Sequence, residues 1–278
     1  MIILEAPAKI NLALDILHKR SDGYHEIDSV MQTIRLADQV TFEYNPQFEL
    51  TCSDGRLPID QRNLAWRAAE LLQQVTGVSQ GVKIHILKNI PIAAGLAGGS
   101  ADAAAVLTGL NQLWELNLST EELMNLGVRL GADVPFCIHK GTARAGGIGE
   151  KLTAIRSQLH ADLLLVTPNV EVSTALAYNR FQAAEALQRP QVGRVVEALE
   201  SGNIEQLTQA WGNVFEELTV IDFPVISQLK KIFCQFGLKA NLMSGSGPSV
   251  FTLNPPTALI EPLCKALPPQ WFQCLTSF

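Results

Sequence analysis

The stretch Pro91-Ile92-Ala93-Ala94-Gly95-Leu96-Ala97-Gly98-Gly99-Ser100-Ala101 separates two segments of different periodicity. Before it, apolar residues at 82, 84 and 86 alternate with their neighbours, which predicts a strand, and after it residues 101–116 carry apolar side chains at helical spacing. Glycines let a backbone approach an anion closely, and the first turn of a helix offers unpaired N–H groups at the positive end of its dipole. The stretch therefore predicts a strand, a phosphate-binding loop and a helix.

This loop is neither of two familiar nucleotide motifs. No Gly-Lys-Ser/Thr follows it, as a Walker A motif requires, and its glycines lack the G-x-G-x-x-G spacing of the dinucleotide fingerprint. Ser100 either caps the helix or offers its hydroxyl to a phosphate or a metal. The alternative is a glycine-rich turn without a ligand, and the order of glycines, serine and alanine-rich helix argues against it.

The composition indicates a globular protein of two domains or one large one. The 278 residues are 47% hydrophobic and 17% charged, and the net charge is −6. This charge argues against a nucleic-acid partner, which needs a basic patch, but allows an anionic small substrate. No secretory signal and no apolar run of roughly 18 residues is visible. We expect a cytoplasmic protein, or a stromal one if a plastid transit peptide has been removed.

The cysteines are predicted to be free thiols. They are odd in number, far apart in the chain, and lack the C-x-x-C and zinc spacings. The five are Cys52, Cys137, Cys234, Cys264 and Cys274.

The order of predicted elements favours an α+β protein of two domains. Residues 10–16 and 30–44 predict strands, and residues 64–76 predict a helix capped by Asn63 and stopped by Gly77. Ser119 and Glu122 form a capping box that opens a further helix. From about residue 160 the chain is richer in helices, which we predict at 172–187, 191–201, 204–218 and 223–236, with strands at 162–167 and 249–253. We place the two domains at residues 1–158 and 159–278.

Two further segments carry small residues around reactive groups. Gly131-Ala132-Asp133-Val134-Pro135 places a carboxylate between small residues and a proline. Phosphoryl transfer to an alcohol uses such a carboxylate to orient the hydroxyl and accept its proton, although an Asp in a loop is more often solvated or capping. The N–H groups of Gly245-Ser246-Gly247 can form an anion nest, but this pattern is also common in ordinary turns.

Together the three segments resemble the GHMP kinases, the superfamily of galactokinase, homoserine kinase, mevalonate kinase and phosphomevalonate kinase. The resemblance covers most of the chain. Ala6-Pro7-Ala8-Lys9-Ile10-Asn11-Leu12 and Asp22-Gly23-Tyr24-His25-Glu26 are similar to one branch. That branch phosphorylates the 2-hydroxyl of a cytidine-diphosphate-linked methylerythritol in non-mevalonate isoprenoid biosynthesis. The resemblance implies an ATP-dependent small-molecule kinase that uses Mg²⁺ and has no nucleic-acid or membrane partner.

The same resemblance implies roles for single residues. Asp133 matches the catalytic base and Lys9 the catalytic lysine, whose ammonium would keep the carboxylate ionised and stabilise charge on the transferred phosphoryl group. Asn11, on the same strand face as Lys9, would hydrogen-bond the substrate. The residues implied for the cytidine substrate are Tyr24, His25, Thr174, Tyr178, Gly245 and Gly247. Those implied for ATP are Asn63 and Leu64 near the adenosine, and Pro91, Ile92, Ala93, Ala94, Gly95, Leu96, Ala97, Gly98, Gly99, Ser100 and Ala101 around the phosphates.

The loop departs from the family pattern at residue 97, where an alanine stands in place of a frequent glycine. A methyl group is tolerated at negative φ and harmful at positive φ. We therefore expect a negative φ at Ala97, with Gly98 and Gly99 making the closest approach to phosphate. Ser246 and Pro248 also vary their loop, so the role of residues 244–249 stays open.

The resemblance implies a two-domain GHMP kinase fold. Its N-terminal domain would be ribosomal-protein-S5-like with a left-handed βαβ crossover, which is rare, and its C-terminal domain ferredoxin-like. Three alternatives stay open: another GHMP kinase acting on homoserine, mevalonate or a sugar, a non-catalytic nucleotide-binding sensor, and a structural protein. The Asp22-to-His25 segment argues against the first, and the presence of both Lys9 and Asp133 argues against the second.

Overall fold

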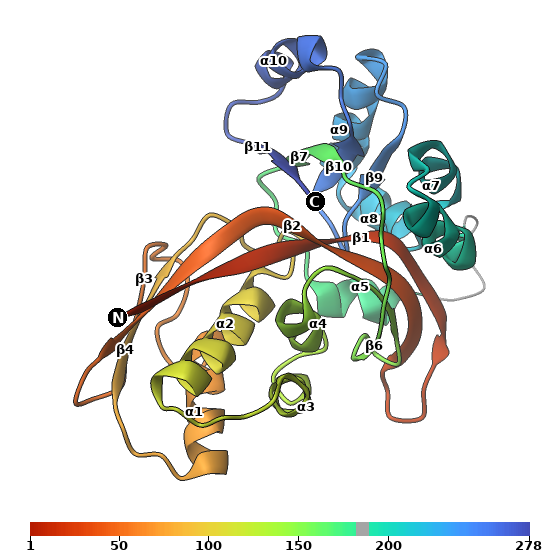
Figure 1. The fold of residues 1–278 in the computed structure, drawn as a ribbon. Coiled ribbons are helices and arrows are strands. Elements are labelled where there is room, and N and C mark those ends of the chain that lie inside the picture. Colours follow the sequence, from red (N-terminus) through yellow and green to blue (C-terminus); the bar gives the residue numbers. More distant parts are fainter. Residues whose placement is uncertain (182–188) are drawn as a thin grey trace. The chain divides into compact units, whose positions relative to one another are not determined.

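The computed structural model describes residues 1–181 and 189–278, which form two compact units (Figure 1). The first unit comprises residues 1–8, 36–90 and 97–140, and the second comprises residues 9–35, 91–96 and 141–278. Two long strands, β1 (Ile2–Lys19) and β2 (His25–Tyr44), contribute residues to both units. The boundary at residue 158 stays a prediction, because these units are not single segments of the chain.

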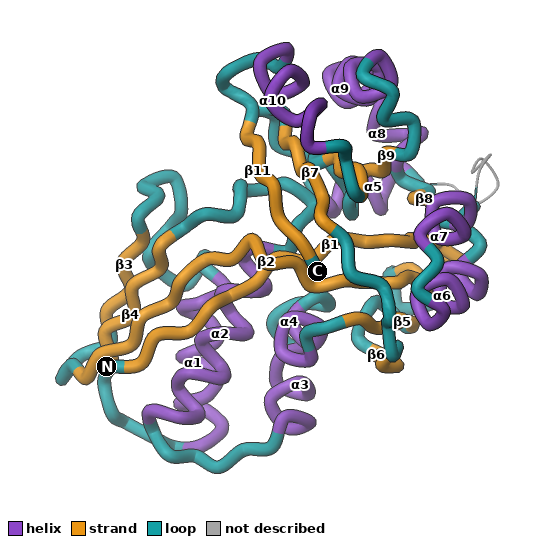
Figure 2. The backbone as a smooth tube through the Cα atoms, turned by 45° about the horizontal axis from the view of Figure 1, so that its top comes forward, coloured by secondary structure: helices purple, strands orange, loops and turns teal. Residues whose placement is uncertain are grey.

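The first unit is a small sheet with helices packed against it. Strand β4 (Val82–Leu87) pairs antiparallel with residues 39–44 of β2 and parallel with β3 (Glu49–Cys52). Helices α1 (Leu64–Thr76) and α2 (Gly98–Leu113) lie side by side, as Figure 2 shows. Gly109 of α2 lets the helix approach the ring of Phe42, because a Cβ there would lie only 2.4 Å from that ring.

Local capping chemistry sets the helix ends of the first unit. Asn63 Oδ1 accepts from the N–H of Ala65 at 2.9 Å, and Gly77 ends α1 at a φ of 73°, so both predictions are confirmed. The predicted capping box opens α3 (Thr120–Val128). The six-residue helix α4 (Val134–His139), which we did not predict, follows it and packs against α2 and α3.

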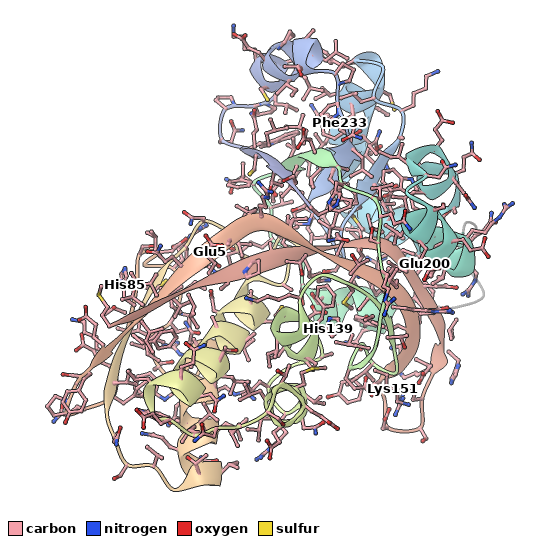
Figure 3. The ribbon with its side chains drawn as sticks, in the orientation of Figure 1. Glu5, His85, His139, Lys151, Glu200 and Phe233 are labelled. Carbon is pink, nitrogen blue, oxygen red and sulfur yellow. The ribbon has the colours of Figure 1, made fainter. Side chains whose placement is uncertain are left out.

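The second unit contains a four-stranded antiparallel sheet in the order β11-β7-β10-β9. These strands are Phe272–Ser277, Asp162–Thr167, Val250–Leu253 and Asn241–Met243. Strands β5 (Thr142–Gly146) and β6 (Lys151–Ala154) form a hairpin that joins residues 29–32 of β2. Phe233, labelled in Figure 3, is fully buried. The helices of this unit are α5 (Thr174–Arg180), α6 (Val192–Ser201), α7 (Ile204–Ala210), α8 (Glu216–Asp222), α9 (Pro224–Gln235) and α10 (Thr257–Ala266).

Two predicted helices of the second unit differ from the structure. The helix predicted over 204–218 is wrong in its middle, because β8 (Gly212–Asn213) separates α7 from α8 and pairs with Ala13 and Leu14 of β1. This long-range pairing overrides the local helical spacing. Of the helix predicted over 172–187, the structure contains α5, which ends at Phe181 with an extended ψ of 125°. Residues 182–188 lie outside the described residues.

Other predictions for the chain are confirmed. The strands predicted at 162–167 and 249–253 form as β7 and β10, and all five cysteines are free thiols. Within the described ranges, no helix combines the length and apolar character that a membrane span requires.

Candidate active site

The predicted phosphate loop, residues 91–97, has a left-handed backbone at every second residue from 93 to 97. The φ angle is 51° at Ala93, 73° at Gly95 and 58° at Ala97. Alternation of left-handed residues with others aims successive N–H groups into a concavity that binds anions. The expectation of a negative φ at residue 97 is wrong, because Ala97 adopts the conformation that favours glycine.

Helix α2 begins at Gly98, directly after this loop and three residues earlier than predicted. Its N-cap residue is Ala97, whose methyl side chain offers no oxygen to the helix, and no side-chain cap is formed. The N–H groups of the first turn therefore suit an external anion.

Other predicted ATP residues lie beside the start of α2. A Cβ on Gly99 would lie 3.7 Å from Leu64 Cδ1, so the leucine at the start of α1 lies next to the first turn of α2. A Cβ on Gly131 would lie 3.9 Å from the Ser100 hydroxyl oxygen, which brings Ser100 to the Asp133 segment. Asn63 is engaged locally, since Oδ1 caps α1 and Nδ2 donates to the Pro58 carbonyl at 2.8 Å.

Asp133 occupies the N-cap position of α4, where we had predicted a loop. Its carboxylate makes no capping hydrogen bond to that helix, so the short helix fixes the backbone without using the side chain. Pro135 in the first turn of α4 restricts the backbone further. Asp133 belongs to the first unit and Lys9 to the second, and their pairing stays a prediction.

Lys9 and Asn11 are buried on β1 and hydrogen-bonded to each other. The Lys9 ammonium donates to Asn11 Oδ1 at 2.7 Å, and Asn11 Nδ2 donates to the Ser29 hydroxyl at 2.9 Å. The Ser29 hydroxyl in turn donates to the Ala13 carbonyl at 2.6 Å. The main-chain N–H of Lys9 also donates to the carbonyl of Leu96 at 3.1 Å. Two predicted site residues therefore meet next to the phosphate loop.

The Gly245–Gly247 turn packs against Gly95 of the phosphate loop. The Ser244 hydroxyl donates to the Gly95 carbonyl at 3.0 Å, and a Cβ on Gly95 would lie 2.2 Å from the Ser244 carbonyl oxygen. Gly245 and Gly247 are left-handed, with φ of 56° and 88°. Asn213 of β8 holds this turn, because its Nδ2 donates to the Gly245 carbonyl at 2.7 Å. We did not predict Asn213, which stands inside the segment that we had predicted to be helical.

The residues implied for the cytidine include an aromatic pair. The ring centroids of His25 and Tyr178 lie 5.6 Å apart, and Phe215 meets Tyr178 edge-on at 4.7 Å. The Thr174 hydroxyl lies 3.0 Å from the Ser246 hydroxyl, within the second unit as well. Tyr24 is 60% exposed, directly before His25.

Charged residues fix the turn that carries Tyr24 and His25. Arg20 bonds to Asp22 at 3.0 Å and to Glu26 at 2.7 Å, and Asp22 accepts from the N–H of Tyr24 at 3.1 Å. The hydrogen bond from Arg20 lowers the pKa of Asp22. The pKa of His25 is also lowered, by burial first and by Lys19 second, which favours a neutral imidazole.

A metal ion would need oxygens from the nucleotide. Among residues 1–181 and 189–278, no three His, Cys, Asp or Glu side chains gather into a metal-binding group. Mg²⁺ in kinases commonly takes most ligands from phosphates and water and only one or two from the protein. The Ser100 hydroxyl, in the first turn of α2, fits that limited demand.

Comparison with known proteins identifies the family. The model of the GHMP kinases N terminal domain matches residues 63–141. A Bacillus pumilus protein called 4-diphosphocytidyl-2-C-methyl-D-erythritol kinase is 48% identical, with 91% of this chain and 88% of that protein aligned. Proteins of the same name from Caldicellulosiruptor bescii and Bacillus subtilis are 47% and 46% identical, over 89% and 91% of this chain and 87% and 88% of theirs.

Solved structures agree with this relationship. A crystal structure of 4-(cytidine 5'-diphospho)-2C-methyl-D-erythritol kinase is 32% identical, with a TM-score of 0.82 and 99% of both chains covered. Homoserine kinase from Cytophaga hutchinsonii is 19% identical, with a TM-score of 0.75 over 99% of this chain and 93% of its own, and shares the fold. The two-domain GHMP kinase fold class is thereby confirmed, and the chain belongs to the 4-diphosphocytidyl-2-C-methyl-D-erythritol kinase family of the GHMP kinases.

Proposed function

We propose that this kinase transfers the γ-phosphoryl group of ATP to the 2-hydroxyl of 4-diphosphocytidyl-2-C-methyl-D-erythritol, giving the 2-phosphate and ADP. Family membership across 91% of the chain carries the choice of acceptor. The left-handed residues of the loop and the uncapped start of α2 support a bound triphosphate. The reaction belongs to non-mevalonate isoprenoid precursor synthesis. We expect it in the cytoplasm, since the relatives named above are bacterial and give no support to a plastid location.

In the proposed reaction, the acceptor oxygen attacks the γ-phosphorus in line with the bond to ADP, which breaks. Asp133 orients the 2-hydroxyl and takes its proton, the role that a carboxylate has in phosphoryl transfer to an alcohol. The Lys9 ammonium and the loop N–H groups stabilise the charge on the transferred group. Asn11 holds Lys9 in place through the 2.7 Å hydrogen bond and contacts the acceptor.

The nucleotide and its metal use residues at both ends of the loop. Residues 91–101 would surround the phosphates, and Asn63 and Leu64 would lie near the adenosine, as the proximity of Leu64 to Gly99 supports. Mg²⁺, held by the phosphates and by the Ser100 hydroxyl, would supply positive charge to the phosphates. Ser100 contributes one neutral oxygen and the remaining ligands would come from ATP and water.

The cytidine end of the acceptor would meet the second unit. Tyr178 and Tyr24 present π-faces on which a base can stack, and His25 presents a hydrogen-bonding edge. Thr174 lies 3.0 Å from Ser246, so its hydroxyl and the Gly245–Gly247 turn would face the same part of the substrate.

A coupled assay tests this function directly. ADP release is followed with ATP, Mg²⁺ and 4-diphosphocytidyl-2-C-methyl-D-erythritol, and in parallel with homoserine, mevalonate and galactose. We expect turnover with the cytidine substrate and none with the other alcohols. Turnover with one of the others instead would assign the chain to another GHMP activity, and ATP binding without acceptor-dependent ADP release would leave the sensor alternative.

A further inference from the structure

Three buried charged side chains in the first unit form a network that joins the residues before the phosphate loop to the residues after it. The Lys88 ammonium donates to Asp102 Oδ2 at 2.8 Å and to Asp38 Oδ2. The side chains of Lys88, Asp38 and Asp102 are 6%, 0% and 4% exposed. All three therefore make their contacts away from solvent, where such contacts are electrostatically strong.

One end of this network holds the chain that enters the loop. Asp38 Oδ1 accepts from the N–H of Asn89 at 2.6 Å and from the N–H of Ile90 at 2.8 Å. These are the last two residues before Pro91, and Lys88 precedes them directly. Asp38, which lies on β2, thus fixes the backbone at the point where β4 leads into the loop.

The other end holds the helix that leaves the loop. Asp102 lies one turn into α2, and its bond to Lys88 ties this helix to the residues ahead of Pro91. A Cβ on Gly98 would lie 3.4 Å from Lys88 Nζ and 3.1 Å from Ile90 Cγ2, so the entering chain packs against the first residue of α2. The two ends of the loop are therefore held at a fixed separation.

This arrangement is poorly explained as a source of stability alone. Two carboxyl groups share one ammonium, and Asp102 Oδ1 is buried without a hydrogen-bond partner in the described structure. Burial raises the pKa of Asp102 to about 7, although the Lys88 ammonium acts to lower it. A buried ion pair is weak support for a fold, because apolar residues of similar volume often serve as well.

We propose that Lys88, Asp38 and Asp102 are positioning residues, which set the separation of the two ends of the phosphate loop and thereby the affinity for ATP. The inference rests on the proposed function, in which this loop binds the ATP phosphates. A loop whose ends are fixed before binding loses less conformational freedom when the ligand arrives. The three side chains act through the backbone, at the entering N–H groups and at α2.

The test measures binding of the non-hydrolysable analogue AMP-PNP with Mg²⁺ by calorimetry, together with steady-state kinetics. Lys88→Met keeps the aliphatic stem but removes the ammonium. We expect its affinity for AMP-PNP to fall by about 10- to 100-fold, with a matching rise in KM for ATP and little change in KM for the acceptor. Lys83→Met, on strand β4 just before Lys88 and in an exposed pair with Glu49 at 3.4 Å, is the matched control and should bind as the wild type does.

A second variant separates positioning from stability. Lys88→Met leaves two buried carboxyl groups without their cation, whereas Lys88→Met/Asp102→Asn removes one of these carboxyl groups. We expect the double variant to recover thermal stability relative to Lys88→Met while its AMP-PNP affinity stays low, because the link across the loop is still absent. Recovery of affinity in step with stability would overturn the proposal, as would wild-type affinity in either variant.

The binding and activity assays together distinguish failure of the proposed function from failure of this inference. A wild-type protein that binds AMP-PNP but does not phosphorylate the cytidine substrate refutes the acceptor assignment, and the binding comparison still decides on the network. A wild-type protein that does not bind AMP-PNP overturns both.

Discussion

The imidazole of His25 and the ring of Tyr178 lie 5.6 Å apart between centroids, with 33° between their planes. His25 begins β2 and Tyr178 lies on α5, so the pair joins elements about 150 residues apart in the chain. Phe215 packs edge-on against the far partner, Tyr178, at 4.7 Å and holds it in place. A nucleobase that stacks here would meet rings with restricted motion.

Replacing Tyr178 by Ala should raise KM for the cytidine substrate by about tenfold or more, because stacking of a base on an aromatic ring is worth about 1–3 kcal/mol. KM for ATP should stay within a factor of about two. Steady-state kinetics with each substrate varied in turn provides the measurement. Tyr44→Ala, which removes an exposed tyrosine of the first unit, is the control. Equal effects on both KM values would remove Tyr178 from the base site.

The lowered pKa of His25 predicts how acceptor binding depends on pH. Burial is the larger cause and the Lys19 ammonium the smaller one, so the imidazole stays neutral to below its ordinary 6.5. A neutral imidazole keeps one acceptor nitrogen, which protonation removes. We expect KM for the cytidine substrate to be constant from about pH 8 to about pH 6.5 and to rise only below that range.

Lys19→Met tests the assigned cause. Without the neighbouring cation, the pKa of His25 should move back up, and the acid rise in KM should begin at a higher pH. The same depressed pKa means that the unfolded chain binds this proton before the folded one, so stability is lost as pH falls below the unfolded value. His25→Gln should abolish the pH dependence of KM. A KM that decreases on acidification would contradict a neutral His25 in the base site.

Asp133→Asn should reduce kcat by about 10²- to 10⁴-fold, the usual contribution of a general base. The carboxylate does not cap α4, so loss of its charge should leave that helix intact. Both KM values should change little. Asp60→Asn, in an exposed pair with Arg62 at 2.7 Å, serves as the control. Near-full turnover by a folded Asp133→Asn enzyme would exclude Asp133 as the general base.

Lys9→Met should lower kcat by about 10²-fold or more, as removal of a donor to the transition state does. It should also destabilise the protein by about 1–3 kcal/mol, because the buried Asn11 Oδ1 would lose the donor that lies 2.7 Å away. Ser29→Ala separates these effects, since it removes the hydroxyl that holds Asn11 but keeps the ammonium. It should affect stability more than kcat. An unchanged kcat in Lys9→Met would exclude the lysine from the chemistry.

The helix ends that the sequence predicted correctly depend on contacts between residues that are close together in the chain. Asn63, its partner Ala65 and the stop at Gly77 lie within one helix, so their chemistry is visible in the sequence. The break between α7 and α8 is not visible in this way, because it depends on a strand pairing between residues 13–14 and 212–213. For the same reason Asn213, which holds the Gly245 turn, stood unnoticed in an apparently helical segment.

In the candidate site, too, the contacts between residues far apart in the chain could not be predicted from local sequence. Motif resemblance pointed to Lys9, Asn11, His25 and Tyr178, and the structure brings these together in two close pairs. The contact of Lys88 with Asp38 and Asp102 spans 50 and 14 residues and carries no local signal. The backbone of the loop was mispredicted, because a left-handed Ala97 is held by its surroundings against its own preference.

We expect Gly95→Ala to displace the phosphate loop, because the added Cβ would clash with the Ser244 carbonyl oxygen. Gly95 and Gly77 share a φ of 73°, but a Cβ on Gly77 meets nothing within 4 Å, whereas one on Gly95 would lie 2.2 Å from the Ser244 carbonyl oxygen. Gly77→Ala should therefore cost only the left-handed conformation, about 1–2 kcal/mol, and leave kcat and KM as in the wild type.

Gly95→Ala carries the same conformational cost and must in addition push the loop away from the Ser244 turn, so it should unfold at lower denaturant concentration than Gly77→Ala. It should also bind ATP more weakly, since the displaced N–H groups belong to the proposed phosphate site. Denaturant unfolding and AMP-PNP titration of the two variants give the comparison. If both variants lose the same stability and bind the nucleotide equally well, Gly95 is an ordinary turn residue and the loop does not depend on its contact with Ser244.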